Sequence, residues 1–189
     1  MSLILASASP RRRELLQVFG LPFTVLPANI DEQRLASESA SEHVIRIALA
    51  KAEAVAHEHP ASPVLGSDTA VVLDGQSLGK PADAQEAESM LRALSGRGHE
   101  VLSSVALVCP DGRRLTRLSR TEVRFAVLPD RWIADYIQSG DPMDKAGAYG
   151  IQNQAGLWIE HIAGSYTGVV GLPLFETGQL LRDAGLLPT

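Results

Sequence analysis

The stretch LILASASPRRRELLQVF, residues 3–19, predicts a strand, a tight loop and a helix in immediate succession. The apolar residues 3–6 form the strand, Ser9 can cap the helix through its hydroxyl, and Pro10 suits the first helical position. The apolar side chains that follow recur at the spacing of one helical face: Leu15, Val18 and Phe19. The free N–H groups at this helix start are therefore suited to bind an anion.

Three consecutive cations, Arg11, Arg12 and Arg13, occupy the first turn of this predicted helix. The helix dipole makes cations locally unfavourable there. Guanidinium forks match phosphate oxygens, so the same three residues favour a phosphate site. The alternative is a solvated basic patch beside a capped helix, and this segment alone does not decide between the two.

The composition is that of a soluble globular protein. The chain has 189 residues, enough for one domain with a proper core, and is 45% hydrophobic and 21% charged. Its net charge of −5 argues against a general nucleic-acid binder, so a local basic site favours a small anionic ligand. The single cysteine, Cys109, excludes an internal disulfide and fits a reducing compartment. With no signal peptide and no apolar run long enough to span a membrane, we expect a cytoplasmic location.

A long alanine-rich helix is predicted over residues 40–57, because Ser39 and Glu42 have the spacing of a capping box. Lys51 falls on the apolar face of this helix, four residues after Ile47. A lysine there either extends along the apolar surface to reach water or directs its charge into a cleft.

Two acidic residues stand out near this helix. Asp68 interrupts a run of strand-forming residues, 63–73, although aspartate is disfavoured inside strands and a buried unpaired carboxylate is costly. Hydrogen bonds to local backbone would explain it, but we favour a carboxylate held rigidly as a metal ligand or general base. Glu32 lies in a polar loop, where an acid is either solvated or binds a divalent cation.

The remaining chain alternates strands and helices without a doubly wound order. Residues 99–108 and 114–125 predict a β-hairpin, residues 157–162 a further strand, and residues 164–170 a second extended piece. Residues 140–154 hold three glycines, and their aromatic and apolar members favour an ordered functional loop. We therefore expect an α/β fold whose mixed sheet contains both parallel and antiparallel pairs.

The chemistry-bearing residues of the first 80 positions form one set: Ser7, Arg11, Arg12, Glu32, Lys51, Asp68 and Lys80. Cations of this kind clamp a polyphosphate, carboxylates hold Mg²⁺ or Mn²⁺, and one carboxylate can activate water. No Ser/His/Asp triad is evident, and Cys109 has no evident base. The set therefore indicates metal-assisted hydrolysis of a phosphoanhydride by direct attack of water.

Six sequence blocks, taken in order, carry a family resemblance: LASASPRRRELL, GSDTAV, LGKPAD, LSGRGHEV, DKAGAYGIQ and GSYTGVVGLPL. The chain resembles the Maf family of nucleoside triphosphate pyrophosphatases over nearly its whole length. This resemblance implies an elongated fold like that of inosine triphosphatase, as one domain over residues 1–189 with two lobes around a central cleft. It also implies a divalent metal cofactor and a possible homodimer.

Within the family, Arg11 and the loop DKAGAYGIQ resemble the branch that acts on dTTP and UTP, rather than the 7-methyl-GTP branch. The resemblance makes Asp68 the proton acceptor and, with Glu32, a metal ligand. The implied specificity positions are Arg11, Thr69 and Gln152. The implied phosphate-binding residues are Ser7, Arg12, Lys51 and Lys80. One departure follows Gln152, where Asn153 replaces the usual glycine.

Two alternatives remain open at this point. The chain could hydrolyse 7-methyl-GTP, as the sister branch does, or could be a non-catalytic nucleotide-binding regulator of cell division. Modified pyrimidine nucleotides are further candidate substrates of the leading hypothesis.

Overall fold

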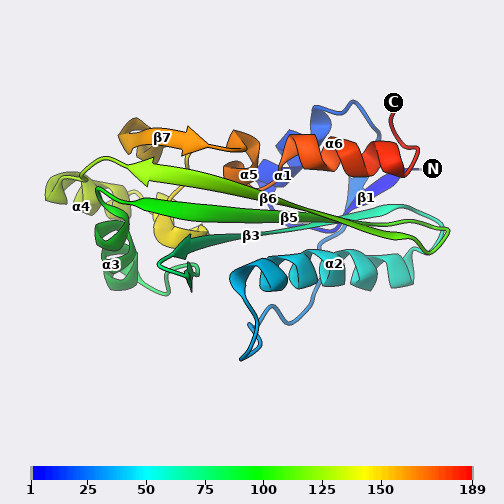
Figure 1. The fold of residues 1–189 in the computed structure, drawn as a ribbon, viewed down its shortest axis with the longest axis horizontal. Helices are drawn as coiled ribbons and strands as arrows, with labels where there is room; N and C mark the ends of the chain where they lie inside the picture. Colours follow the sequence, from blue (N-terminus) through cyan, green and yellow to red (C-terminus); the bar gives the residue numbers. More distant parts are fainter. Residues whose placement is uncertain (1, 189) are drawn as a thin grey trace.

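A seven-stranded mixed sheet organises the computed structural model, which describes residues 2–188 (Figure 1). Its strands are β1 (Leu3–Leu5), β2 (Phe23–Val25), β3 (Val64–Leu73), β4 (Gln76–Leu78), β5 (Gly98–Val108), β6 (Arg114–Phe125) and β7 (Ile159–Ala163). The order is β2-β1-β3-β5-β6-β7, with β4 paired to β3. The β1 strand pairs in parallel with β2 and β3, and the other pairs are antiparallel. The predicted α/β fold with a mixed sheet is confirmed.

Helices cover both faces of this elongated sheet (Figure 1). They are α1 (Pro10–Gln17), α2 (Ala40–Glu58), α3 (Ala84–Leu94), α4 (Asp130–Gln138), α5 (Tyr166–Val170) and α6 (Leu174–Asp183). The α2 helix lies along one face, α1 and α6 lie on the other, and α3 and α4 lie at the far end. Three short 3₁₀ turns, η1 (Asp141–Asp144), η2 (Ala146–Ala148) and η3 (Gln154–Trp158), follow α4. None of the helices in residues 2–188 is long and apolar enough to cross a membrane.

The α2 helix packs closely against β3. Small residues make this possible, because Ala48 and Ala52 on α2 face Gly66 on β3. A Cβ on Gly66 would collide with the Ala48 carbonyl oxygen and would lie 2.9 Å from the Ala52 nitrogen. The glycine therefore lets the helix backbone approach the strand two residues before Asp68.

Local capping signals fix both helices next to the site as predicted. Ser9 accepts a hydrogen bond from the backbone N–H of Arg12, with Pro10 in the first turn. Ser39 and Glu42 form the reciprocal capping box of α2. Both helix starts are thus set by short-range sequence.

The prediction of an extended segment at residues 164–170 is wrong, because residues 166–170 form helix α5. Ser165 caps this short helix by accepting a hydrogen bond from the N–H of Gly168 at 2.9 Å. The β-forming character of its Tyr, Thr and Val residues is overridden by this cap and by packing of Val170 in the core.

Candidate active site

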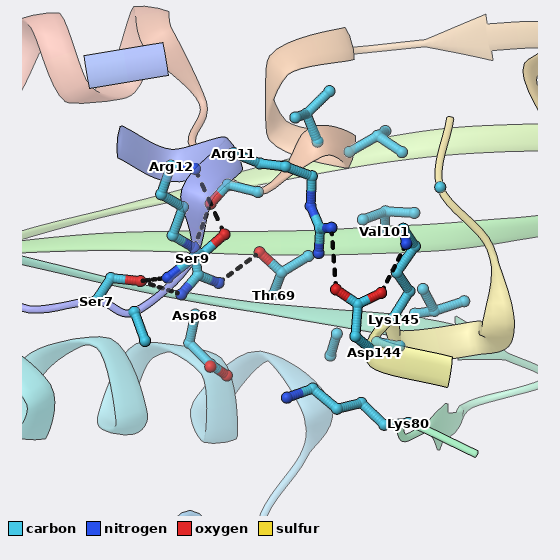
Figure 2. A pocket seen from close by; sticks show the side chains of 18 of the residues that line it. Ser7, Ser9, Arg11, Arg12, Asp68, Thr69, Lys80, Val101, Asp144 and Lys145 are labelled. Atoms are coloured by element: carbon cyan, nitrogen blue, oxygen red, sulfur yellow. Dashed lines mark hydrogen bonds and ion pairs between the residues drawn. The ribbon is translucent and has the colours of Figure 1, made fainter. Parts of the chain in front are cut away.

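All nine sequence-predicted site residues line one cleft of about 640 Å³. They are Ser7, Arg11, Arg12, Glu32, Lys51, Asp68, Thr69, Lys80 and Gln152. The cleft lies where the start of α1, the middle of β3 and the loop of 3₁₀ turns meet (Figure 2). Five cationic and three carboxylate side chains line it, so its charge is positive within a protein of net charge −5. Such a local field attracts polyanions.

Arg12 is fixed at one side of the cleft by its neighbours on several elements (Figure 2). Its Nη1 donates to the Ser67 carbonyl at 2.8 Å and to Ser7 Oγ at 3.3 Å, and its Nε donates to the Gly171 carbonyl at 2.9 Å. Its Nη2 donates to Thr69 Oγ1 at 3.3 Å. Burial lowers the pKa of Arg12 from its usual value. A guanidinium has five N–H groups, so one remains for a ligand.

Ser7 and Thr69 lie beside Arg12 on the same side of the cleft. Ser7 is buried, and its hydroxyl oxygen accepts from the N–H of Ser9 at 3.2 Å as well as from Arg12. Because the oxygen acts as an acceptor in both bonds, its proton is left to donate to a ligand oxygen. Thr69 Oγ1 lies 3.1 Å from Ser103 Oγ, which fixes its rotamer toward Arg12.

Lys51 joins the two predicted metal ligands. Its Nζ donates to Asp68 Oδ1 and to Glu32 Oε2, each at 2.9 Å. Lys51 and Asp68 are 7% and 8% exposed, whereas the Glu32 side chain is 54% exposed. Of the two directions left open for Lys51, the structure shows the one into the cleft, and the Lys51 cation compensates the buried charge of Asp68.

Glu32 and Asp68 fit a hard divalent cation by their chemistry, because Mg²⁺ is held through one or two carboxylates together with substrate phosphates. No group of three histidine, cysteine, aspartate or glutamate side chains suited to a metal occurs in the part of the chain that the structure describes. If a divalent cation binds here, Glu32 and Asp68 would be its carboxylate ligands, and phosphate oxygens of the substrate would supply further ligands.

Lys80 and Gln152 reach the cleft from other directions. Lys80 follows β4, is exposed, and in Figure 2 directs its ammonium toward the side on which Asp68 lies. Gln152 is exposed in the loop that carries the 3₁₀ turns. Both side chains are therefore free to meet a ligand at the rim.

Sequence reasoning missed two further residues of the cleft, Asp144 and Lys145. Arg11 crosses the cleft, and its Nη1 lies 3.3 Å from Asp144 Oδ2 (Figure 2). Lys145 is buried, and its Nζ donates to Asp144 Oδ1 and to the Asp141 carbonyl, each at 2.6 Å. The signal was present, since acids precede Lys145 by one and by four residues, but only the fold shows that Asp144 meets Arg11.

The Asp141 carboxylate accepts hydrogen bonds from several residues of the loop that carries the 3₁₀ turns and from α4. It accepts from Lys145 Nζ, from Tyr136 Oη at 2.6 Å and from Asn153 Nδ2 at 2.6 Å. Burial raises the pKa of Asp141, but hydrogen bonds from Tyr136 and its other donors outweigh this effect, and the pKa is lowered overall. Asn153, where the sequence departs from the family pattern, thus takes part in positioning the loop.

Tyr149 belongs to the same loop and lines the cleft. Its hydroxyl lies 2.7 Å from His99 Nε2, and its ring packs edge-on against Phe125. Burial lowers the pKa of His99 to about 4, so the imidazole is neutral at pH 7. Burial also raises the pKa of Tyr149. The pair is therefore uncharged.

Comparison with known proteins shows close relatives over the whole chain. A dTTP/UTP pyrophosphatase from Symbiobacterium thermophilum is 53% identical over 183 residues, which cover 97% of this chain and 94% of that protein. The dTTP/UTP pyrophosphatases of Ralstonia nicotianae and Bordetella pertussis are 50% and 52% identical, each over 97% of this chain and over 94% and 93% of their own lengths.

A solved structure shares the architecture. A HAM1 protein from Coxiella burnetii superposes with a TM-score of 0.57 over 97% of this chain and 100% of that chain, at 19% identity. This likeness shows a common fold. Residues 2–184 match the family described as Maf-like protein. That match, with relatives about 50% identical along nearly the whole chain, shows that this protein belongs to the Maf-like family.

Proposed function

We propose that this protein is a nucleoside triphosphate pyrophosphatase that hydrolyses dTTP and UTP to the monophosphate and pyrophosphate. The observation that carries the proposal is the arrangement at Lys51, whose ammonium joins Asp68 and Glu32 beside Arg12 in one positive cleft. The relatives named dTTP/UTP pyrophosphatase support the same substrate class. Residues 1–189 act as one domain around this cleft.

The triphosphate binds through the cations and the Ser7 hydroxyl. Arg12 offers its remaining N–H, Lys51 offers an ammonium beside Asp68, and Lys80 offers one from the segment that follows β4. Because four hydrogen bonds already fix Arg12, little side-chain entropy is lost when it binds a phosphate oxygen.

Asp68 accepts a proton from the attacking water. The water oxygen bonds to the α- or the β-phosphorus, and the bond from that phosphorus to the bridging α–β oxygen breaks. The bridging oxygen keeps the electron pair, and the products are the monophosphate and pyrophosphate. Lys51 holds one oxygen of Asp68, which leaves the other to receive the proton. A divalent cation, Mg²⁺ or Mn²⁺, held by Glu32 and Asp68 would neutralise charge on the phosphates.

Base preference resides at the other end of the cleft. Gln152 has one acceptor and two donors, which suit the alternating carbonyl and N–H groups of a pyrimidine edge. Arg11 repels a cationic base such as 7-methylguanine, and Thr69 lies between Arg12 and Ser103 at the boundary of the two regions. The enzyme acts in the cytoplasm, possesses no nucleic-acid partner and works as a homodimer in this proposal.

The test is a panel of nucleoside triphosphates with Mg²⁺ or Mn²⁺, in which released pyrophosphate is measured. We expect the highest kcat/KM for dTTP and UTP, and a loss of about 10²- to 10⁴-fold in Asp68→Asn at unchanged folding, the range typical of a general base. Faster hydrolysis of 7-methyl-GTP would assign the protein to the sister activity. Tight nucleotide binding without pyrophosphate release would favour the regulatory role.

A further inference from the structure

The loop over residues 26–39 carries Glu32 and is anchored by apolar packing only at its start, where Leu26 and Ala28 pack against the core. It joins β2 to α2 without regular secondary structure, and residues 31–37 are all exposed. Leu35 is 58% exposed. Burial of apolar surface therefore does not explain how Glu32 is kept 2.9 Å from Lys51.

A second carboxylate in the same loop, Glu38, is held tightly from several sides. Its side chain is 6% exposed. Arg46 on α2 donates to it twice, from Nε at 2.6 Å and from Nη2 at 2.9 Å. His43 Nδ1 lies 3.1 Å away, and the N–H of Leu35 donates to the carboxylate at 3.2 Å.

Arg46 also reaches the residue that follows Glu32. Its Nη2 donates to the carbonyl oxygen of Gln33 at 3.0 Å. One guanidinium on a rigid helix therefore binds the loop at two points, immediately after Glu32 and at Glu38. A planar fork spreads its donors over three nitrogen atoms and can do this, whereas a lysine would need its single nitrogen within reach of both acceptors.

We propose that Glu38 and Arg46 are positioning residues, which hold the loop so that Glu32 stays beside Lys51 and Asp68. The inference rests on the proposed function for its kinetic consequence, but not for its structural one. Hydrogen bonds from Arg46 lower the pKa of Glu38 to about 2, in agreement with a carboxylate that stays ionised in this contact.

The variants that test this are Glu38→Gln and Arg46→Met, and the matched control is Glu53→Gln. Glu53 also lies on α2 and pairs with an arginine, Arg114, but this pair touches neither the loop nor the cleft. Arg46→Lys is the conservative variant, which keeps the charge and loses the fork.

The first readout needs no activity. Arg34 lies in the loop and donates from Nε and Nη2 to the Glu38 carbonyl, so we expect these bonds to slow trypsin cleavage after this exposed residue. We expect cleavage after Arg34 to become at least tenfold faster in Glu38→Gln and Arg46→Met, with partial protection in Arg46→Lys and none of this change in Glu53→Gln. Unchanged cleavage in both test variants would overturn the inference.

The second readout is kinetic. If the contact positions Glu32, the Mg²⁺ concentration for half-maximal rate should rise about tenfold and kcat should fall, with the nucleotide KM nearly unchanged. Faster proteolysis with metal activation equal to that of Glu53→Gln would show a merely structural contact and also overturn the inference. A wild-type protein that releases no pyrophosphate would instead refute the proposed function, while the proteolysis result would still stand.

Discussion

The two sides of the cleft are built in different ways. The side that we propose binds phosphates, here called the phosphate side, has its central side chains on regular elements, with Arg12 on α1, Lys51 on α2 and Asp68 on β3. The side that we propose selects the base, here called the base side, is the late loop, residues 141–158, whose 3₁₀ turns are held by Asp141, Lys145 and Asn153. Packing of helices against strands places the central groups of the first side, whereas the second side is a loop held by polar side-chain contacts above a few buried residues.

This difference suits the two tasks that we propose. Transfer of a proton and stabilisation of developing charge require groups held at fixed distances, which helices and strands provide. Selection among bases requires a surface that sequence changes can reshape, and a loop provides it without disturbing the sheet. The two sides should therefore respond differently to mutation.

The largest effect is expected where the layers of the phosphate side meet, in Gly66→Ala. The new Cβ would collide with the Ala48 carbonyl and push α2 away from β3. We expect a loss of about 3 kcal/mol in the free energy of unfolding, as for overpacked cores. Because Lys51 and Asp68 lie on the two separated elements, kcat should fall as well. Denaturant unfolding measures the loss of stability, and the rate of pyrophosphate release measures the fall in kcat.

A glycine of the same sheet provides the control. In Gly98→Ala on β5 the nearest neighbour of the new Cβ is Glu122 Oε1 at 3.7 Å, an ordinary contact. This variant should unfold and react like the wild type. A Gly66→Ala protein as stable as Gly98→Ala would show that the layers are not in close contact here.

The contrast between the two sides also explains what the sequence could predict. The capping signals of α1 and α2 involve residues close together in sequence, Ser9 with Pro10 and Ser39 with Glu42. The helix starts of the phosphate side were therefore predictable. Lys51 could be placed on the inner face because helical periodicity depends only on spacing.

The late loop lacks such local signals. Tyr149 depends on His99, fifty residues earlier, and Arg11 depends on Asp144, 133 residues later. Such contacts arise only when the sheet and helices bring distant segments together. The same limit applies to residues 166–170, where strand-forming residues were read without the Ser165 cap and without the core that receives Val170.

An intermediate effect is expected on the base side at acid pH. His99 is neutral in the fold because burial lowers its pKa to about 4, whereas an unfolded histidine titrates near 6.5. Between these values the unfolded chain binds a proton that the folded one does not, so stability falls as pH falls. We expect a loss of about 2 kcal/mol between pH 7.5 and pH 5 from this residue.

Denaturant unfolding of the wild type and of His99→Gln across this pH range isolates the contribution, because the other histidines are common to both proteins. The difference in unfolding free energy between the wild type and His99→Gln should change by about 2 kcal/mol between pH 7.5 and pH 5. Equal pH dependence of the two proteins would show that His99 titrates normally and does not hold Tyr149 as a neutral partner.

The smallest effect is expected at Asp144, which joins the two sides through Arg11. The contact is 3.3 Å long, and the two side chains are 31% and 65% exposed, so it contributes at most about 1 kcal/mol. Asp144→Asn, whose amide oxygen can still accept from Lys145, should therefore lower the ratio of kcat/KM for UTP over 7-methyl-GTP by roughly fivefold. Glu88→Gln, which removes the exposed pair with Arg92 on α3, is the control. An equal change in kcat/KM for UTP and for 7-methyl-GTP, at constant ratio, would place Asp144 with the phosphate side instead. The expected change in the ratio rests on the orientation of Arg11, because among residues 2–188 the Arg11 side chain forms a hydrogen bond or ion pair only with Asp144.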